Sequence, residues 1–282
     1  MKKYALLTFA AAFGLLSISV PITIRQTAHA QGNTTRDFVP PIVIQAAGPK
    51  LASIQSSVDE YRAAMGGLNN GNLPGPLASG RREINWDGGS TTNLSTTVSG
   101  NPFTGFLVTR GALFTTPDGK GFVQAPAVAD PVLFPPGGLA GLFNNPTYGN
   151  IFNAFSRERL FSAIGGKITE VNFFVPGGGN RPATVTGFGA VFTDVDLPDG
   201  SGSTASTLIE CFAADGNLLF SSSVPASPGD GSLSFFGVVF PDARIARVRI
   251  TSGNVAPGPD DQGTQDVVMM DDFIYGEPQA LP

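Results

Sequence analysis

Hydrophobic residues recur at helical spacing in one segment of the chain, residues 49–65. The apolar positions are three or four residues apart, so they would share one face of a helix; they are Leu51, Ile54, Val58, Tyr61 and Met65. Pro49 suits the first turn of a helix, and the Gly66-Gly67 pair suits its C-terminal end. We therefore expect one amphipathic α-helix over residues 49–65.

From Glu83 onward the pattern changes to short apolar or alternating segments, separated by turns rich in glycine, proline, asparagine and aspartate. This pattern predicts β-strands, over residues 83–86, 105–109, 112–115, 121–125, 159–162, 168–175, 183–192, 207–213, 218–224, 233–240, 244–251 and 267–275. Asp215-Gly216-Asn217 lies between two of these segments and indicates a hairpin. No helical pattern separates the strands, so we expect antiparallel sheets.

These patterns predict an all-β protein, an antiparallel β-sandwich or jelly roll with a short N-terminal helical appendage. Abundant glycine (36), proline (23) and phenylalanine (22) fit many short strands around a phenylalanine-rich core. We divide the chain into a signal peptide (1–30), an N-terminal arm, helix and linker (31–82), a β-sandwich domain (83–277) and a tail (278–282). A long loop rich in glycine and proline, residues 127–147, is expected to cross one end of the sandwich.

The first thirty residues have the pattern of a secretory signal peptide. Met1-Lys2-Lys3 is basic, residues 5–20 are apolar, and Ala28-His29-Ala30 is a small-x-small cleavage site, so the mature chain would begin near Gln31. We therefore expect a secreted protein, extracellular or periplasmic. No second long apolar run follows, so we expect no membrane segment after cleavage.

Cleavage would remove His29, the only histidine, and three basic residues, so the net charge would change from −5 to −8. Such an acidic chain, without clusters of lysine and arginine, does not suit nucleic acid or an anionic membrane surface. Catalytic triads, Cys-His pairs and zinc sites need imidazole or several thiolates, so the composition excludes them. Cys211, the single cysteine, lies in a strand pattern and is expected to be buried.

Oxygen-donor side chains remain, and the acidic ones cluster. Asp260, Asp261 and Asp266 lie in a loop that runs into a strand carrying Asp271 and Asp272. Calcium takes six to eight oxygen ligands, often from flexible loops. The sequence therefore makes this segment a candidate Ca²⁺ site.

Asp271 and Asp272 are expected to point to opposite faces of their strand, so at least one carboxylate would lie on the apolar side and need a partner. Arg247 and Arg249 of a neighbouring strand are available. Two alternatives stay open for this pair: a structural arginine or backbone N–H partner, or a bound Ca²⁺ ion.

Asp194 and Asp196 form a second candidate cation site, two residues apart at a strand end. The segment resembles an EF-hand loop only superficially, because Asp199 comes one residue late and position twelve would be Ala205 instead of glutamate. We reject the EF-hand and keep two alternatives, a solvated strand end and a cation site.

Glycoside hydrolysis would need two positioned acidic residues. The candidates are Glu83, Asp87, Glu158, Glu170 and Glu210, and the sequence gives no distance between any two of them. Trp86, the only tryptophan, alternates with Ile84, so we expect it in the core and not on an exposed sugar-stacking surface.

Three parts of the predicted sandwich carry a family resemblance: REINWDG at residues 82–88, ATVTGFGAVFTDVD at 183–196, and ARVRITS at 246–252 with MDDFIYG at 270–276. Together they resemble the secreted bacterial jelly-roll domains found in PEP-CTERM-type exported proteins, without the sorting tail, and more loosely the carbohydrate-binding-module-like β-sandwiches. In such jelly rolls a structural calcium often lies between the opening strand and an aspartate of the closing strand. The resemblance thus implies Asp87 together with Asp271 or Asp272 as metal ligands.

We expect an exported, non-catalytic β-sandwich that is stabilised by Ca²⁺ and acts as a binding or structural module, with a glycan or the extracellular matrix as its partner. The alternative is a carboxylate-dependent polysaccharide hydrolase or lyase. A third possibility is a purely structural envelope protein whose helix docks a partner.

Overall fold

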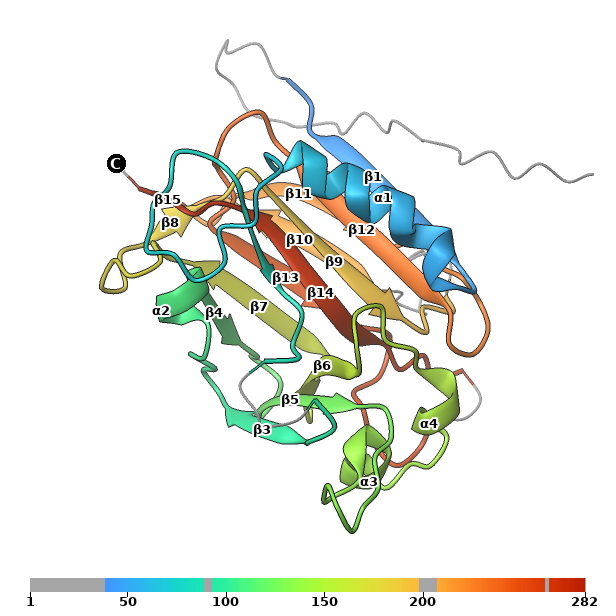
Figure 1. Cartoon of the computed structure of the whole chain (residues 1–282). Helices are drawn as coiled ribbons and strands as arrows, with labels where there is room; N and C mark the ends of the chain where they lie inside the picture. The colour runs from blue at the N-terminus through green and yellow to red at the C-terminus, as the bar shows by residue number, and fades with distance from the viewer. Residues whose placement is uncertain (1–38, 89–92, 198–206, 262–263, 282) are drawn as a thin grey trace, which may run out of the picture.

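The computed structural model describes residues 39–88, 93–197, 207–261 and 264–281. Two antiparallel β-sheets pack face to face, which confirms the expected all-β sandwich (Figure 1). The predicted signal peptide, residues 31–38 and the Asp199-Gly200 turn lie outside the described residues.

The large sheet has eight strands. Its order is β1 (Ile42–Gly48), β12 (Leu233–Val239), β9 (Gly187–Thr193), β14 (Met269–Gly276), β6 (Arg159–Ile164), β5 (Gly121–Pro126) and β3 (Thr97–Gly100), with β2 (Arg81–Ile84) also paired to β14. The pairing of β12, β9 and β14 is antiparallel. The neighbouring ends of these three strands therefore meet at one end of the sandwich.

The small sheet has five strands, in the order β11 (Leu218–Ser223), β10 (Leu208–Phe212), β13 (Arg247–Thr251), β7 (Ile168–Phe173) and β4 (Ala112–Thr115). The predicted hairpin at Asp215-Gly216-Asn217 is confirmed, because it joins the antiparallel pair β10 and β11. A third, two-stranded sheet pairs β15 (Gln279–Ala280) with β8 (Ala183–Thr184), so part of the predicted tail is hydrogen-bonded to the body of the protein.

Aromatic side chains fill the space between the large sheet and the small sheet. Trp86 is fully buried and stacks on Phe161 at a ring-centroid distance of 3.7 Å. Its indole N–H donates a hydrogen bond to the backbone carbonyl of Asp271 at 3.0 Å. The prediction that Trp86 belongs to the core is confirmed, and Cys211 is buried in the same core, as predicted.

The predicted helix is confirmed as α1 (Leu51–Ala64), which lies along the outer face of the large sheet (Figure 1). Its buried face packs on Val191, Phe235 and Ile274. Close approach of the Tyr61 ring requires two glycines beneath it. A Cβ atom at Gly189 or Gly237 would lie 2.8 Å or 2.5 Å from the Tyr61 ring.

The expectation of an N-terminal arm before the helix is wrong for residues 42–48. These residues form β1, which pairs along its whole length with β12. Both faces of β1 are covered in part, by α1 on one side and by the core on the other. Its residues are therefore all apolar or small apart from Gln45, and polar and apolar residues do not alternate along it. Pro40 and Pro41 lie just before its first residue.

Other differences concern short elements. Residues 107–110 form a helical turn, α2 (Leu107–Arg110), and not the predicted strand, and the turn ends at Gly111 in the left-handed conformation with φ +70°. Strand β3 was not predicted. The long loop at 127–147 contains α3 (Gly138–Phe143) and is followed by α4 (Tyr148–Ile151).

We expect α1 to be part of the folding unit, which the removal of one buried side-chain carbon can test. Ile54 lies on the buried face of α1 and is fully buried, whereas Ile42 on β1 is 60% exposed. Ile54→Val should lower the free energy of unfolding by about 0.5–1.5 kcal/mol, because it removes a buried methylene. The same change at Ile42 should have almost no effect. Urea unfolding followed by the fluorescence of Trp86 measures both, and equal effects would show that α1 is only loosely attached.

Candidate metal centre

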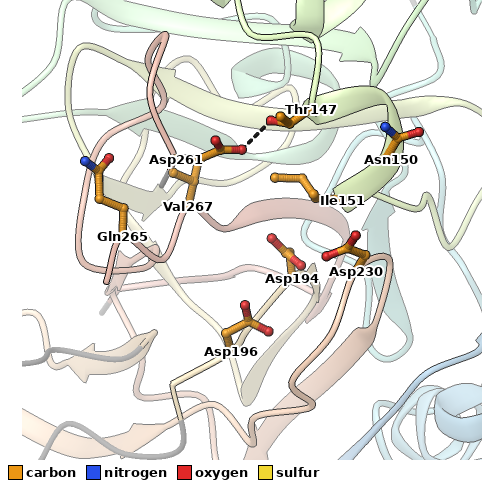
Figure 2. A pocket seen from close by; sticks show the side chains of 9 residues that line it. All are labelled: Thr147, Asn150, Ile151, Asp194, Asp196, Asp230, Asp261, Gln265 and Val267. Carbon is orange, nitrogen blue, oxygen red and sulfur yellow. Dashed lines mark hydrogen bonds between the residues drawn. The ribbon is translucent and has the colours of Figure 1, made fainter. Parts of the chain in front are cut away.

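Four aspartates line one pocket at the end of the sandwich where β9 stops (Figure 2). The pocket has a volume of about 330 Å³. Its wall is formed by Thr147, Asn150, Ile151, Asp194, Asp196, Asp230, Asp261, Gln265 and Val267. Eight of these nine residues come from turns and loops or from strand and helix ends, which is where polar groups can face a cavity without disturbing a core.

The sheet order explains why these side chains meet. Asp194 directly follows β9, Asp230 lies in the turn before β12, and Asp261 lies in the loop before β14. Because β9 lies between β12 and β14 and is antiparallel to both, its C-terminal end adjoins their N-terminal ends. Helix α4 supplies the opposite wall through Asn150 and Ile151, with Thr147 immediately before it.

Asp194 is the least compensated group of the pocket. It is 7% exposed, and its Oδ1 atom is buried with no hydrogen-bond partner among the described residues. Burial, followed by repulsion from Asp196, Asp266, Asp230 and Asp261, raises the pKa of Asp194 to about 8. Its backbone φ of +68° lies in the left-handed region, which aspartate and asparagine adopt more readily than other non-glycine residues.

Asp266 lies beside the pocket and is 3% exposed. Its Oδ1 accepts a hydrogen bond from the backbone N–H of Asp196 at 3.4 Å, while its Oδ2 is buried with no partner in the described part of the chain. Burial is the main cause that raises the pKa of Asp266 to about 6. Two buried carboxylate oxygens at this end of the sandwich therefore have no hydrogen-bond donor within the described ranges.

Hydrogen bonds hold two other acidic side chains of the pocket in place, those of Asp196 and Asp261. Asp196 accepts a bond from the backbone N–H of Gly229 at 2.9 Å, and the Thr147 hydroxyl donates to Asp261. Within the described ranges, no lysine or arginine forms an ion pair with Asp194, Asp196, Asp230 or Asp266. Like charges that gather in a pocket without a cation repel one another. A bound cation would remove this repulsion.

The donor set is all oxygen, which suits Ca²⁺ or another hard cation. In the described residues, however, no three acidic, cysteine or histidine side chains form a complete ligand set for a metal ion. The pocket is thus an open site, in which backbone carbonyls, the neutral oxygens of Thr147, Asn150 and Gln265, or water would complete the coordination shell.

The structure joins two candidate clusters that were separate in the sequence. Asp194 and Asp196 share the pocket with Asp261, and Asp266 lies next to them. Asp260 does not line the pocket, and it accepts a hydrogen bond from Gln265 at 3.4 Å. Asp230 was missed, because Gly229-Asp230-Gly231 has the composition of an ordinary turn and only the sheet order places it near Asp194.

Asp271 and Asp272 lie elsewhere, in a β-bulge of β14. The register between β14 and β9 shifts by one residue between Met270 and Phe273. The expectation of opposite faces is therefore wrong, since both carboxylates lie within hydrogen-bond distance of the Ser156 hydroxyl, at 3.1 Å and 2.6 Å. A bulge inserts one extra residue and reverses the alternation beyond it.

Backbone N–H groups and an arginine are partners of this pair in the structure, and the Ca²⁺ alternative stays a prediction. Asp271 accepts bonds from the backbone N–H groups of Phe155 and Ser156, at 2.6 Å and 3.1 Å. Asp272 pairs with Arg62 of α1 at 3.1 Å. Burial, and then repulsion by Asp272, raises the pKa of Asp271 well above its usual range.

The expectation that Arg247 or Arg249 pairs with the Asp271 and Asp272 carboxylates is wrong. Arg247 and Arg249 both form ion pairs with Glu170 on the small sheet. Both arginines lie on β13, which pairs with β7, the strand that carries Glu170. Their side chains therefore reach this carboxylate across the small sheet, and not through the core.

Asp87, the other residue that the family resemblance implied, holds the chain just before β6. Its Oδ1 accepts bonds from the backbone N–H groups of Glu158 and Arg159, at 3.3 Å and 3.2 Å. Its Oδ2 is buried without a hydrogen-bond partner among the described residues. Asp87 and Asp271 thus fasten the same short segment, residues 155–159.

No helix in the described ranges has both the length and the hydropathy needed to cross a membrane. Comparisons of the chain with protein-family models, with characterised proteins and with solved structures find no match.

Proposed function

We propose that this chain is an exported, non-catalytic β-sandwich module whose aspartate pocket binds Ca²⁺. The observation that carries the proposal is Asp194, a carboxylate that is almost fully buried, has no donor on Oδ1 among the described residues, and faces a pocket lined by three more aspartates. Such a group is costly to bury unless a cation compensates it. Export rests on the leader pattern of residues 1–30.

Calcium at this position would join three loops that are distant in sequence. The loops after β9, before β12 and before β14 each contribute an aspartate to the pocket. A native-state ligand stabilises a protein only when it binds the unfolded chain less well, and a site assembled from three such loops meets that condition. The proposed role of the ion is therefore structural, and a glycan or matrix polymer is the proposed partner on the basis of the family resemblance.

Scanning calorimetry of the chelated protein, with and without added Ca²⁺, tests the proposal. At a Ca²⁺ concentration one hundred times the dissociation constant, the ion should add about 2.7 kcal/mol to the stability, which corresponds to a rise in Tm of roughly 5–10 °C for a chain of this size. Sodium chloride at equal ionic strength should not reproduce the rise, because it only screens the charges. A Tm that is the same in Ca²⁺ and in EDTA would contradict the proposal.

The non-catalytic part of the proposal has its own test. Incubation with a panel of neutral and acidic polysaccharides should release neither reducing ends nor unsaturated sugars. Turnover that depends on the enzyme concentration would instead support the carboxylate-dependent hydrolase or lyase.

A further inference from the structure

We infer that Asp271 is a protonated carboxylic acid in the folded protein at neutral pH, and that this proton makes the connection of α1 and residues 155–159 to β14 sensitive to pH. The inference goes beyond the proposed function and does not depend on it, because the aspartate pocket uses other carboxylates. It is carried by the hydrogen bonds around Ser156, by burial, and by the charges that act on the pair.

Two carboxyl groups lie against one hydroxyl group. The Oγ atom of Ser156 is 3.1 Å from Oδ1 of Asp271 and 2.6 Å from Oδ1 of Asp272. A serine hydroxyl has one hydrogen to donate, and an ionised carboxylate has none. If both carboxyl groups were ionised, two anions would share that single hydrogen. A proton on one of them supplies the second hydrogen bond.

Asp272 is the ionised member of the pair. Its Oδ2 atom lies 3.1 Å from the guanidinium group of Arg62, and the 2.6 Å between Ser156 and Asp272 is typical of a hydroxyl bound to a carboxylate. Asp271 is fully buried and forms no ion pair in the described part of the chain. Its Oδ2 atom accepts two backbone N–H bonds, so the proton belongs on Oδ1, where the Ser156 oxygen can accept it.

The charges around the pair favour the same assignment. Burial and the charge of Asp272 raise the pKa of Asp271, and the N–H groups of Phe155 and Ser156 oppose them only in part. Burial raises the pKa of Asp272 as well, but Ser156 and Arg62 of α1 lower it, while Glu83 of β2 raises it. The pair therefore holds one proton, and Asp271, which has no cation beside it, holds it.

The bulge connects three parts of the protein. Asp271 accepts the N–H groups of residues 155 and 156, Asp272 pairs with Arg62 of α1, and the Ser156 hydroxyl lies between the two carboxyl groups. Loss of the proton would place two negative charges at one hydroxyl. Because the native state binds this proton more tightly than the unfolded chain does, the connection should weaken as the pH rises.

Infrared spectroscopy of the full chain in EDTA at pH 7 detects the proton directly, because the C=O band of a carboxylic acid lies apart from the bands of carboxylates. Asp194→Asn serves as the background, since the pKa of Asp194 is also raised, to about 8. Adding Asp271→Asn to this background should remove one acid band. Adding Asp215→Asn, in the exposed β10–β11 turn, should remove none.

Asparagine substitutions also distinguish the two carboxyl groups by stability. An amide has the shape of the neutral acid, so at position 271 its oxygen can accept the two N–H bonds while its NH₂ group donates to Ser156. Asp271→Asn should therefore keep the urea midpoint at or above that of the wild type at pH 7, and should reduce its decline towards pH 9. Asp272→Asn should lower the midpoint, because Arg62 loses a charged partner.

Three results would overturn the inference. One is an acid band that survives Asp271→Asn. Another is an Asp271→Asn protein that does not fold, or that unfolds at a lower urea concentration than Asp272→Asn. The third is loss of the Asp271 acid band from the Asp194→Asn protein on addition of Ca²⁺, which would place the ion at this pair. The first two results leave the Ca²⁺ pocket unaffected.

Discussion

Arg82→Ala is expected to lower the free energy of unfolding by about 3–5 kcal/mol, because it leaves a buried carboxylate without its cation. Arg82 and Glu277 are fully and almost fully buried, and they form two parallel hydrogen bonds of 2.6 Å and 2.7 Å. The same guanidinium also donates to the backbone carbonyls of Gly71 and Leu73, at 2.8 Å each. This one side chain therefore fastens the segment after α1 to the end of β14.

A double variant distinguishes loss of the pair from loss of one partner. Arg82→Met combined with Glu277→Met removes both charges and keeps most of the volume. It should be more stable than Arg82→Ala, since no uncompensated charge is left in the interior. Urea unfolding measures both, and an Arg82→Ala protein within 1 kcal/mol of the wild type would show that water reaches Glu277 in place of the arginine.

Asp194→Asn is expected to change two properties in opposite directions. Without Ca²⁺ at pH 8, the variant should be more stable than the wild type by at least about 1 kcal/mol, because an amide removes the buried charge and its repulsion. In Ca²⁺ it should be less stable than the wild type, since the central ligand is lost. Asparagine is the appropriate replacement, as it tolerates the left-handed backbone at this position.

The pH dependence of the chelated protein follows from the same group. The pKa of Asp194 is about 8 in the folded state, against 3.8 for an ordinary aspartate, and the pKa of Asp266 is raised to about 6. Between pH 4 and 8 the native state therefore binds more protons than the unfolded state, so the stability of the metal-free protein should fall as the pH rises through this window.

Thermal unfolding of the wild type, Asp194→Asn and Asp215→Asn in EDTA, from pH 5 to pH 8, measures this effect. Asp215→Asn is the control, because Asp215 lies in the exposed β10–β11 turn, outside the pocket. The wild type and the control should lose stability as the pH rises, and Asp194→Asn should lose less. Saturating Ca²⁺ should reduce the decline in the wild type, because the ion competes with the proton for the same oxygens. Parallel pH profiles for all three proteins would show that Asp194 titrates normally.

The sequence was sufficient for elements with a strong local pattern. Apolar residues from Ile54 to Tyr61 repeat at helical spacing, and the observed helix covers the same stretch. Strands such as β13 and β7, each with one covered and one exposed face, alternate clearly. Strand β1 is covered on both sides and carries no alternation, so its pairing with β12 depends on contacts more than 180 residues apart. The jelly-roll strand order stays a prediction.

The candidate site could be predicted only in part. Composition indicated that oxygen donors must supply any metal binding. Clustering along the sequence, with the family resemblance for Asp87, gave the candidates Asp87, Asp260, Asp261, Asp266, Asp271 and Asp272, with Asp194 and Asp196 as a second set. Of these, only Asp194, Asp196 and Asp261 line the pocket, and Asp266 lies beside it. Their convergence depends on β9 lying between β12 and β14, which no local pattern contains. The bulge at Asp271 could not be predicted either, because one inserted residue changes the direction of every later side chain without altering the composition.

The most direct test of the Ca²⁺ pocket is an anomalous difference map from crystals of the protein grown in saturating Ca²⁺. The account predicts density inside the pocket, with the Asp194 carboxylate in contact with the ion and Asp196, Asp230 or Asp261 completing the acidic ligands. Crystals without a peak at Asp194, or with calcium bound only beside Asp87, would contradict it.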